Sequence, residues 1–317
     1  MNPIPVARSM GSSPPKHGDL PTEAEMFRQI MVTVEAAWQN RLSQAQVEKW
    51  LFNFKGKVFS LRYERQLALW LLCNFVYYNQ SEVRHLCKTA FREYLHFSLE
   101  KNRHCMDGDL EESANKIVEN SRFYHAGRPG ESGGFVLYYF RQENNLGVRN
   151  FLTSPDKLPP NVDTIVFIDD VVLSGEQAKI YLNRVTASYD QDKTKLLLTF
   201  FSTDEAEELL RRNQIHVISC IKLDERSKCF SENSNAFVNH PLHRKNGKDL
   251  AEAYGEKLMP NDPLGYGDGQ YAFGFYFNTP DNTLPIFWSE RAGWTPIMKR
   301  YDKIYGKGGS SELGRFV

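Results

Sequence analysis

Two adjacent acids, Asp169 and Asp170, stand between a short apolar run and a small-residue turn at Ser174 and Gly175. The apolar run, residues 164–168, is rich in β-branched side chains, which predicts a strand buried on both faces in a parallel sheet. Apolar residues recur at helical spacing after the turn, so a helix is expected to follow it directly. The order of strand, acid pair, turn and helix is typical of a ligand site in an α/β protein.

The turn has the chemistry of a phosphate site. The N-terminus of a helix carries unpaired N–H groups and partial positive charge, and a Ser-Gly turn lets the backbone approach a ligand closely. Two carboxylates would repel that phosphate, so the acid pair must serve hydroxyl groups or a cation beside it. A sugar phosphate meets both demands. The alternative is that the acids only cap the helix and that the turn binds nothing.

The segment 168–175 resembles the 5-phosphoribosyl-1-pyrophosphate (PRPP) loop of type I phosphoribosyltransferases. The resemblance implies that Asp169 and Asp170 hold the ribose hydroxyls. Two positions depart from the family pattern, which usually has a small or hydroxyl residue where Leu173 stands and Thr or Ser where Gln177 stands. The phosphate contacts that the resemblance implies are Ser174, Gly175, Glu176 and Gln177.

A second small-residue loop, residues 127–134, lies upstream of the acid pair, as the pyrophosphate loop of that family does. The run after it, residues 135–145, suits either a strand or a helix. A helix would make this loop a second anion site, whereas the alternative is a glycine-rich surface connection. The candidate residues for the departing pyrophosphate are Arg128, Ser132, Gly133, Gly134 and Arg141.

The rest of the chain sets the expected architecture. Helices are expected near residues 22–40, 43–54, 62–78 and 81–97, and they predict an α-helical domain. Strands near 195–201, 215–223 and 271–277 alternate with helices near 203–213 and 248–258, which predicts a parallel sheet. The expected fold class is α/β. We expect a tail (1–20), an α-helical domain (21–107), a parallel-sheet type I phosphoribosyltransferase-like domain (108–305) and a second tail (306–317).

A loop rich in Asn, Asp, Thr and Pro, residues 278–288, follows the last expected strand and is either a rigid turn or a recognition loop. With the block 293–300, the helical first half and the Asp-Asp motif, it resembles a bacterial, conflict-system-associated branch of phosphoribosyltransferase-like proteins. Some members of that branch are effectors encoded beside retron reverse transcriptases. The predicted acceptor-side residues are Asn278, Asp281, Asn282 and Trp288.

Composition limits the classes of function. Lys+Arg and Asp+Glu balance at 39 each, so no overall field attracts nucleic acid or an anionic membrane. No apolar run is as long as a membrane span and no signal-peptide region is recognised, which predicts a cytoplasmic protein. Five cysteines without Cys-x-x-Cys spacing argue against a zinc site.

The resemblance implies an effector that binds PRPP, or a related ribose phosphate, with Mg²⁺ held through the ligand and not directly by the protein. It would transfer or hydrolyse the phosphoribosyl group, as a toxic effector in bacterial anti-phage defence. The alternative is a non-catalytic PRPP or nucleotide sensor held by a reverse transcriptase–nucleic acid complex. The acceptor, the trigger and a homo-oligomeric state stay open.

Overall fold

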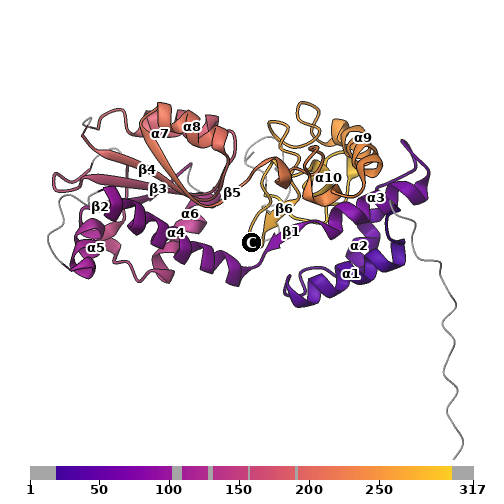
Figure 1. Ribbon diagram of the computed structural model, residues 1–317, viewed down its shortest axis with the longest axis horizontal. Helices are drawn as coiled ribbons and strands as arrows, with labels where there is room; N and C mark the ends of the chain where they lie inside the picture. The colour runs from indigo at the N-terminus through magenta and orange to yellow at the C-terminus, as the bar shows by residue number, and fades with distance from the viewer. Residues whose placement is uncertain (1–18, 102–108, 128–130, 156–157, 190–191, 302–317) are drawn as a thin grey trace, which may run out of the picture.

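The structure is a computed structural model of the chain that describes residues 19–101, 109–127, 131–155, 158–189 and 192–301. The chain forms two lobes that lie side by side (Figure 1). One lobe is built around a four-stranded sheet, and the other contains both the first helices and the last segments of the described chain. The two expected tails fall almost entirely outside the described residues.

The four-stranded sheet is parallel, and its strands lie in the order β2-β3-β4-β5. The register pairs Phe123 with Val166, Val166 with Leu196, and Leu196 with His216. The central strands are almost continuously apolar because helices cover both of their faces. The strands are β2 (Ser121–His125), β3 (Thr164–Val172), β4 (Thr194–Ser202) and β5 (Ile215–Lys222).

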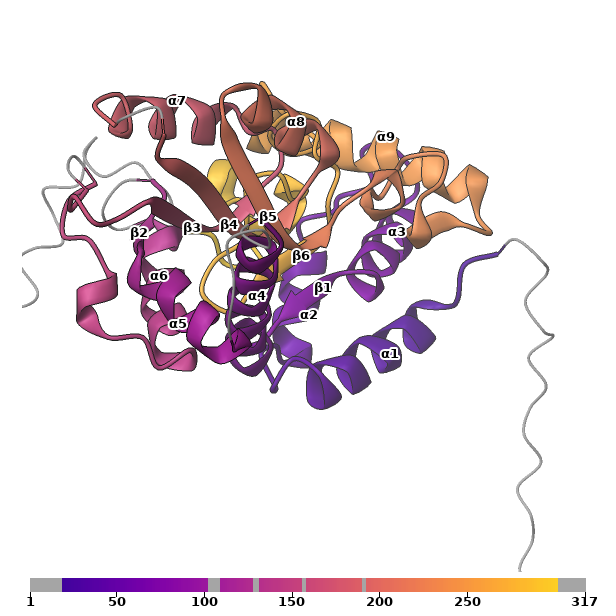
Figure 2. The ribbon, with the colours of Figure 1, turned by 60° about the vertical axis from the view of Figure 1, so that its left-hand side comes forward.

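Two helical layers cover this sheet, as Figure 2 shows. Val166 and Ile168 of β3 pack with α4, α5 and α6, whereas Ile165 and Phe167 pack with α7 and α8. Successive side chains of a strand point to opposite faces, which explains this division. The helices are α4 (Gln80–Lys101), α5 (Leu110–Glu119), α6 (Ser132–Glu143), α7 (Glu176–Val185) and α8 (Asp204–Arg212).

A short parallel bridge extends the sheet beyond β2. Phe151, directly after the 3₁₀ turn η2 (Val148–Asn150), pairs with Phe123, and the amide of Leu152 donates to the carbonyl oxygen of Phe123 at 3.1 Å. From β2 the chain passes through α6 to the Phe151 bridge at one edge of the sheet, and from β3 it passes through α7 to β4 in the opposite direction. The helices α6 and α7 lie on opposite faces of the sheet. The topological switch point lies between β2 and β3, and ligands of doubly wound sheets bind beyond the carboxyl ends of the strands at such a point.

The second lobe joins segments from both halves of the chain. A parallel two-stranded sheet pairs Val76 with Phe273 and Tyr78 with Phe275. Its largest buried rings include Trp50, which stacks on Phe287 with 5.8 Å between ring centroids. The elements are α1 (Glu23–Ala36), α2 (Gln44–Leu51), α3 (Leu61–Cys73), β1 (Val76–Tyr78), α9 (Pro241–Leu258), β6 (Phe273–Phe275) and α10 (Pro285–Trp288).

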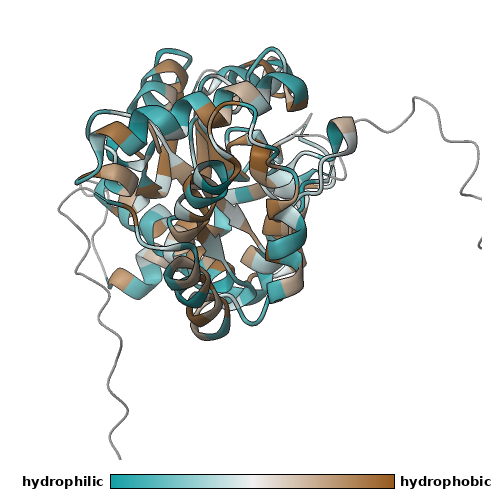
Figure 3. Cartoon of the chain, turned by 90° about the vertical axis from the view of Figure 1, so that its right-hand side faces the viewer, coloured by the Kyte–Doolittle hydropathy of each residue, from teal (hydrophilic) through white to brown (hydrophobic). Residues whose placement is uncertain are grey.

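Aromatic contacts join the two lobes at the carboxyl end of β4. Phe201 lies 5.1 Å from Tyr78 and 5.3 Å from Phe273, measured between ring centroids. Apolar residues gather in the layers around the strands, while the outward helix faces are mostly hydrophilic (Figure 3). Among the described residues, we find no helix with the length and apolar character that crossing a bilayer requires.

Several helices and strands begin or end at other residues than the sequence predicts. The helix expected at 62–78 ends at Cys73, and residues 76–78 form β1 because the amide of Val76 donates to the carbonyl oxygen of Ala272, 2.9 Å away. The helix expected from 248 begins at Pro241, a residue that suits a first helical turn. The strand expected at 271–277 has three residues.

The hydrophobic cores do not follow the boundary expected near residue 107. The helix α4 packs with the four-stranded sheet, whereas α1, α2 and α3 share a core with α9 and α10. The other expected domain limits stay predictions.

Candidate functional site

The acid pair lies near the carboxyl end of β3, inside the strand and not after it. The side chain of Asp170 points toward the start of α6, where it meets Ser132, and it shares a hydrogen bond with Asp169. Asp170 is 7% exposed, and Asp169 is half-buried. The two carboxyl groups therefore lie together at the switch point.

Asp170 accepts hydrogen bonds from the first residue of α6 and from the next residue of its own strand. The hydroxyl of Ser132 donates to Oδ1 of Asp170 at 3.0 Å, and the amide of Val171 donates to the same oxygen at 3.0 Å. Burial raises the pKa of Asp170, and the hydrogen bonds with Asp169 and Ser132 only partly oppose it. The charged form of a buried carboxyl group is stabilised by a hydrogen-bond donor or by a positive charge, such as a hydroxyl group or a cation.

The loop after β2 leads into a helix, so the helical alternative for residues 135–145 is confirmed. A Cβ on Gly133 would lie 2.4 Å from the carbonyl oxygen of Ala126 and 3.0 Å from that of Ile168. Only glycine lets α6 start so close to the ends of β2 and β3. A Cβ on Gly134 would meet no heavy atom within 4 Å, so the backbone is open there. The structure thus brings Ser132, Gly133 and Gly134 to the acid pair.

The turn after β3 has the backbone form of an anion site. Gly175 has a φ of +73°, and a Cβ there would lie 3.2 Å from the backbone of Ala206. No side chain caps the N-terminus of α7, whose first two side chains, Glu176 and Gln177, are exposed. Lys179 pairs with Glu176 at 2.6 Å and so brings a positive charge to the first turn of α7.

Comparison with known families gives this arrangement a context. The PRTase-CE family model matches residues 47–300, which is more than half of the chain. The chain belongs to the PRTase-CE family. Its α/β architecture with parallel strands is phosphoribosyltransferase-like, as the resemblance of the acid-pair segment predicts. No curated protein gives a significant match.

Among solved structures, the chain is similar to the crystal structure of orotate phosphoribosyltransferase from Aeropyrum pernix. The identity is 19% and the TM-score is 0.25, over 36% of this chain and 65% of that enzyme. The match thus spans less than two thirds of the enzyme. A likeness this remote carries no weight for activity or substrate.

Two arginines, Arg128 and Arg141, are predicted for the pyrophosphate. Arg128 lies outside the described residues. Arg141 is in the last turn of α6 and is half-buried. At 1.5 Å per residue, it lies about 13 Å along the helix from Ser132. In this PRTase-CE chain, the candidate pyrophosphate site therefore depends on the loop itself.

The predicted acceptor loop begins beside this site, because the ring of Phe135 in the first turn of α6 lies 5.0 Å from that of Phe277. Its four candidate side chains contact other residues of the C-terminal segment, which favours a rigid turn over a free recognition loop. These contacts are Asn278 Oδ1 with the amide of Tyr301 at 3.2 Å, Asp281 with Arg300 at 2.8 Å, Asn282 Nδ2 with the carbonyl of Tyr266 at 2.9 Å, and Trp288 Nε1 with the carbonyl of Thr283 at 2.7 Å.

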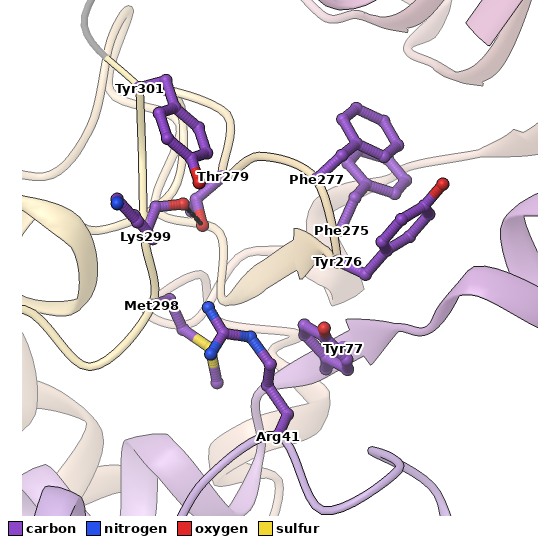
Figure 4. A pocket seen from close by; sticks show the side chains of 9 residues that line it. All are labelled: Arg41, Tyr77, Phe275, Tyr276, Phe277, Thr279, Met298, Lys299 and Tyr301. Carbon is purple, nitrogen blue, oxygen red and sulfur yellow. Dashed lines mark hydrogen bonds between the residues drawn. The ribbon is translucent and has the colours of Figure 1, made fainter. Parts of the chain in front are cut away.

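A small cavity lies beside the start of this loop (Figure 4). The rings of Phe275, Tyr276 and Phe277 gather on one side of it, and Met298 and Lys299 lie on the other. Its volume of about 10 Å³ is close to that of a single water site. It has no room for a base or another acceptor.

Sequence reasoning missed one residue at this edge of the sheet. His125 is the last residue of β2, and its ring stacks on Tyr124 with 4.4 Å between ring centroids. Burial lowers the pKa of His125, and its Nδ1 atom is buried without a hydrogen-bond partner in the part of the chain that the structure describes. A lone histidine carries no motif, so only its position at the end of β2 could have indicated it.

Proposed function

We propose that this PRTase-CE chain binds PRPP, or a related ribose phosphate, at the carboxyl ends of β2 and β3, and transfers or hydrolyses the phosphoribosyl group. The observation that carries the proposal is the hydrogen bond of 3.0 Å between Ser132 and Asp170. It joins the two loops that the sequence predicts for opposite ends of one ligand, at the switch point where doubly wound sheets bind ligands.

Each part of the ligand has a matching group in the chain. Asp169 and Asp170 accept hydrogen bonds from the ribose hydroxyls, and each such bond to a charged group contributes about 1.5–3 kcal/mol. The uncapped amides of α7 and the Ser174 hydroxyl hold the phosphate, with Lys179 as a cation nearby. Gly133 and Gly134 let the pyrophosphate approach the start of α6.

The donor set at this edge fits a magnesium ion that is bound mainly through the ligand. Among the described residues, no three His, Cys, Asp or Glu side chains come together as a metal site. Mg²⁺ would be held through the pyrophosphate oxygens of the ligand and not directly by Asp169 and Asp170, which would hold the ribose. When bound, Mg²⁺ neutralises charge on the leaving pyrophosphate.

The test compares two acids at opposite ends of β3. We expect Asp170→Asn to weaken PRPP binding about tenfold to a hundredfold in calorimetry with Mg²⁺, and to reduce pyrophosphate release accordingly. Asp163→Asn is the matched control, because Asp163 is an exposed acid directly before the strand. Equal pyrophosphate release from wild type and Asp170→Asn would refute the assigned roles.

A second candidate is a sensor that binds PRPP without transferring it. The acceptor loop favours it, since the four candidate side chains hold the loop together and the adjacent cavity is only about 10 Å³. Calorimetric binding of PRPP without pyrophosphate release, in the presence of nucleobases and water as acceptors, would select this candidate.

The biological setting of either candidate is part of the proposal. We propose a toxic effector in bacterial anti-phage defence, held by a reverse transcriptase–nucleic acid complex, on the basis of the resemblance described for the C-terminal blocks. The test is co-expression with such a partner during phage infection. Growth arrest that depends on Asp170 is expected, and equal survival of wild type and Asp170→Asn cells would contradict the role.

A further inference from the structure

A large cavity lies in the second lobe, away from the acid pair. Its volume is about 420 Å³, within the range of about 300–1,000 Å³ that small-molecule sites occupy. Its walls come from the end of α2, the loop after it, the end of α9 and the turn that includes η5 (Arg291–Gly293). This cavity shares no residue with the proposed PRPP site.

Four lysines line the cavity: Lys49, Lys55, Lys57 and Lys257. None of the four forms an ion pair with another described residue. A hydrogen bond with Lys257 and the repulsion between the two positive charges lower the pKa of Lys57. Since the chain as a whole carries no net charge, this is a local concentration of positive charge that a bound anion would relieve.

A buried carboxylate fixes the loop that carries two of these lysines, Lys55 and Lys57. Glu64 accepts hydrogen bonds from the amides of Gly56 and Val58, both at 2.7 Å, and from the hydroxyl of Tyr254 at 2.7 Å. The same hydroxyl accepts the amide of Lys55 at 2.8 Å. The lysine backbones are thus arranged before any ligand arrives, which reduces the loss of conformational freedom on binding.

The opposite wall is equally fixed and includes aromatic side chains. Asn53 binds Thr295 through two hydrogen bonds, of 2.8 and 3.0 Å. Trp294 contacts Tyr254 with 5.4 Å between ring centroids, and Phe52 is 60% exposed at the edge of the cavity. Aromatic rings of this kind are stacking surfaces for planar bases.

We propose that this cavity binds a nucleoside polyphosphate, with its phosphates on Lys57 and Lys257 and its base against Phe52 and Trp294. The volume suits one nucleotide, and the charge is gathered in one hollow and not spread along a stripe as a nucleic acid strand would require.

The test titrates the full-length protein with a fluorescent N-methylanthraniloyl derivative of ATP. We expect Lys257→Glu to weaken binding at least tenfold, which corresponds to about 1.4 kcal/mol. Lys245→Glu is the matched control, since it makes the same change on an exposed lysine of α9 that does not line the cavity. A change of less than twofold is expected there. Thermal unfolding of both variants checks that they are folded.

Two further variants complete the test. Phe52→Ala tests the contact with the base independently of the phosphates, and Asp170→Asn tests whether the nucleotide binds in the cavity or beside β3. Phe52→Ala should weaken binding of the nucleotide but not of inorganic triphosphate. Asp170→Asn should leave nucleotide binding unchanged, because Asp170 belongs to the other lobe. If Asp170→Asn abolishes nucleotide binding, the ligand occupies the site beside β3 and the proposal for this cavity fails, whatever becomes of PRPP.

The other outcomes are equally decisive. The proposal is overturned if the folded Lys257→Glu protein binds the nucleotide as wild type does, or if wild type shows no binding at millimolar concentration. It is also overturned if inorganic triphosphate binds as tightly as ATP, or if a single-stranded oligonucleotide displaces the probe at lower concentration than ATP does.

Discussion

Each lobe contains one acid that is nearly inaccessible to solvent, and the two acids have opposite properties. Glu64 in the second lobe is 0% exposed, and Asp170 in the first lobe is 7% exposed. Burial would raise the pKa of Glu64, but hydrogen bonds from Val58, Tyr254, Phe59 and Gly56 outweigh it and hold the pKa below its ordinary value. At Asp170 burial prevails and the pKa is raised.

The difference teaches how to distinguish a structural acid from one with a chemical role. A carboxylate surrounded by four donors has all its needs met inside the protein, and it organises the loop that donates to it. Burial raises the pKa of Asp170, so a ligand that adds a hydroxyl group or positive charge would favour its charged form. A buried carboxyl group therefore supports the fold in one lobe and belongs to the candidate site in the other.

The largest expected effect is on Glu64→Gln. The amide group of Gln would face backbone N–H groups that need acceptors, so we expect a loss of about 3 kcal/mol in the free energy of unfolding. Chemical denaturation measures it. Glu252→Gln on the exposed face of α9 is the control and should change stability by less than about 0.5 kcal/mol. A neutral effect of Glu64→Gln would mean that the acid is not structural.

Next in size is the contact between the two loops at Asp170. Gly133→Ala would place a Cβ 2.4 Å from a backbone oxygen, so α6 must move away from β3. We expect a loss of about 2 kcal/mol in stability and a loss of PRPP binding, measured by thermal unfolding and calorimetry. Gly134→Ala is the matched control for stability, because its Cβ would meet open space in the unliganded protein. Equal stability of the two variants would show that the loops need not meet.

A smaller effect, of opposite sign, is expected at Asp170→Asn. Removing a buried charge whose pKa is raised should increase the free energy of unfolding of the unliganded protein at neutral pH by about 1 kcal/mol, although it weakens PRPP binding. Denaturation without ligand measures it. A clear loss of stability would place Asp170 in the same class as Glu64.

The smallest expected effect is the change in the free energy of unfolding with pH, which has opposite signs for Glu64 and Asp170. Folding lowers the pKa of Glu64, so this acid stabilises the fold at a pH above its ordinary pKa of 4.5. That stabilisation is lost as the pH falls through the pKa of the folded state. Folding raises the pKa of Asp170, so this acid stabilises the fold at a pH below its ordinary pKa of 3.8. That stabilisation is lost as the pH rises through the pKa of the folded state. Unfolding of wild type and both variants between about pH 3.5 and pH 7 should show these opposite trends.

Local patterns in the sequence predicted most of the first lobe. The strand at 164–168, the turn at Gly175 and the helix after it follow from short-range preferences, and they appear as β3 and α7. The helix α6 was one of two alternatives, because a buried apolar run suits both a strand and a helix.

The features that the sequence did not reveal depend on contacts between distant segments. The sheet β1–β6 joins residues 76–78 to 273–275, and the Phe151 bridge adds one pair to β2. The lysine cavity collects residues from three segments, 49–57, 254–258 and 292–295. None of these arrangements has a local period or motif, so only the folded chain brings them together.

The pairing of β1 with β6 also has a consequence for biosynthesis. The second lobe takes its first three helices from the beginning of the chain and its closing strand from near the end, so the whole sheet lobe emerges from the ribosome in between. The rings of Trp50 and Phe54 lack their final partners, Phe287 and Trp294, until residues 287–294 have been translated. A prematurely terminated product would therefore expose these rings and be a substrate for chaperones and proteases.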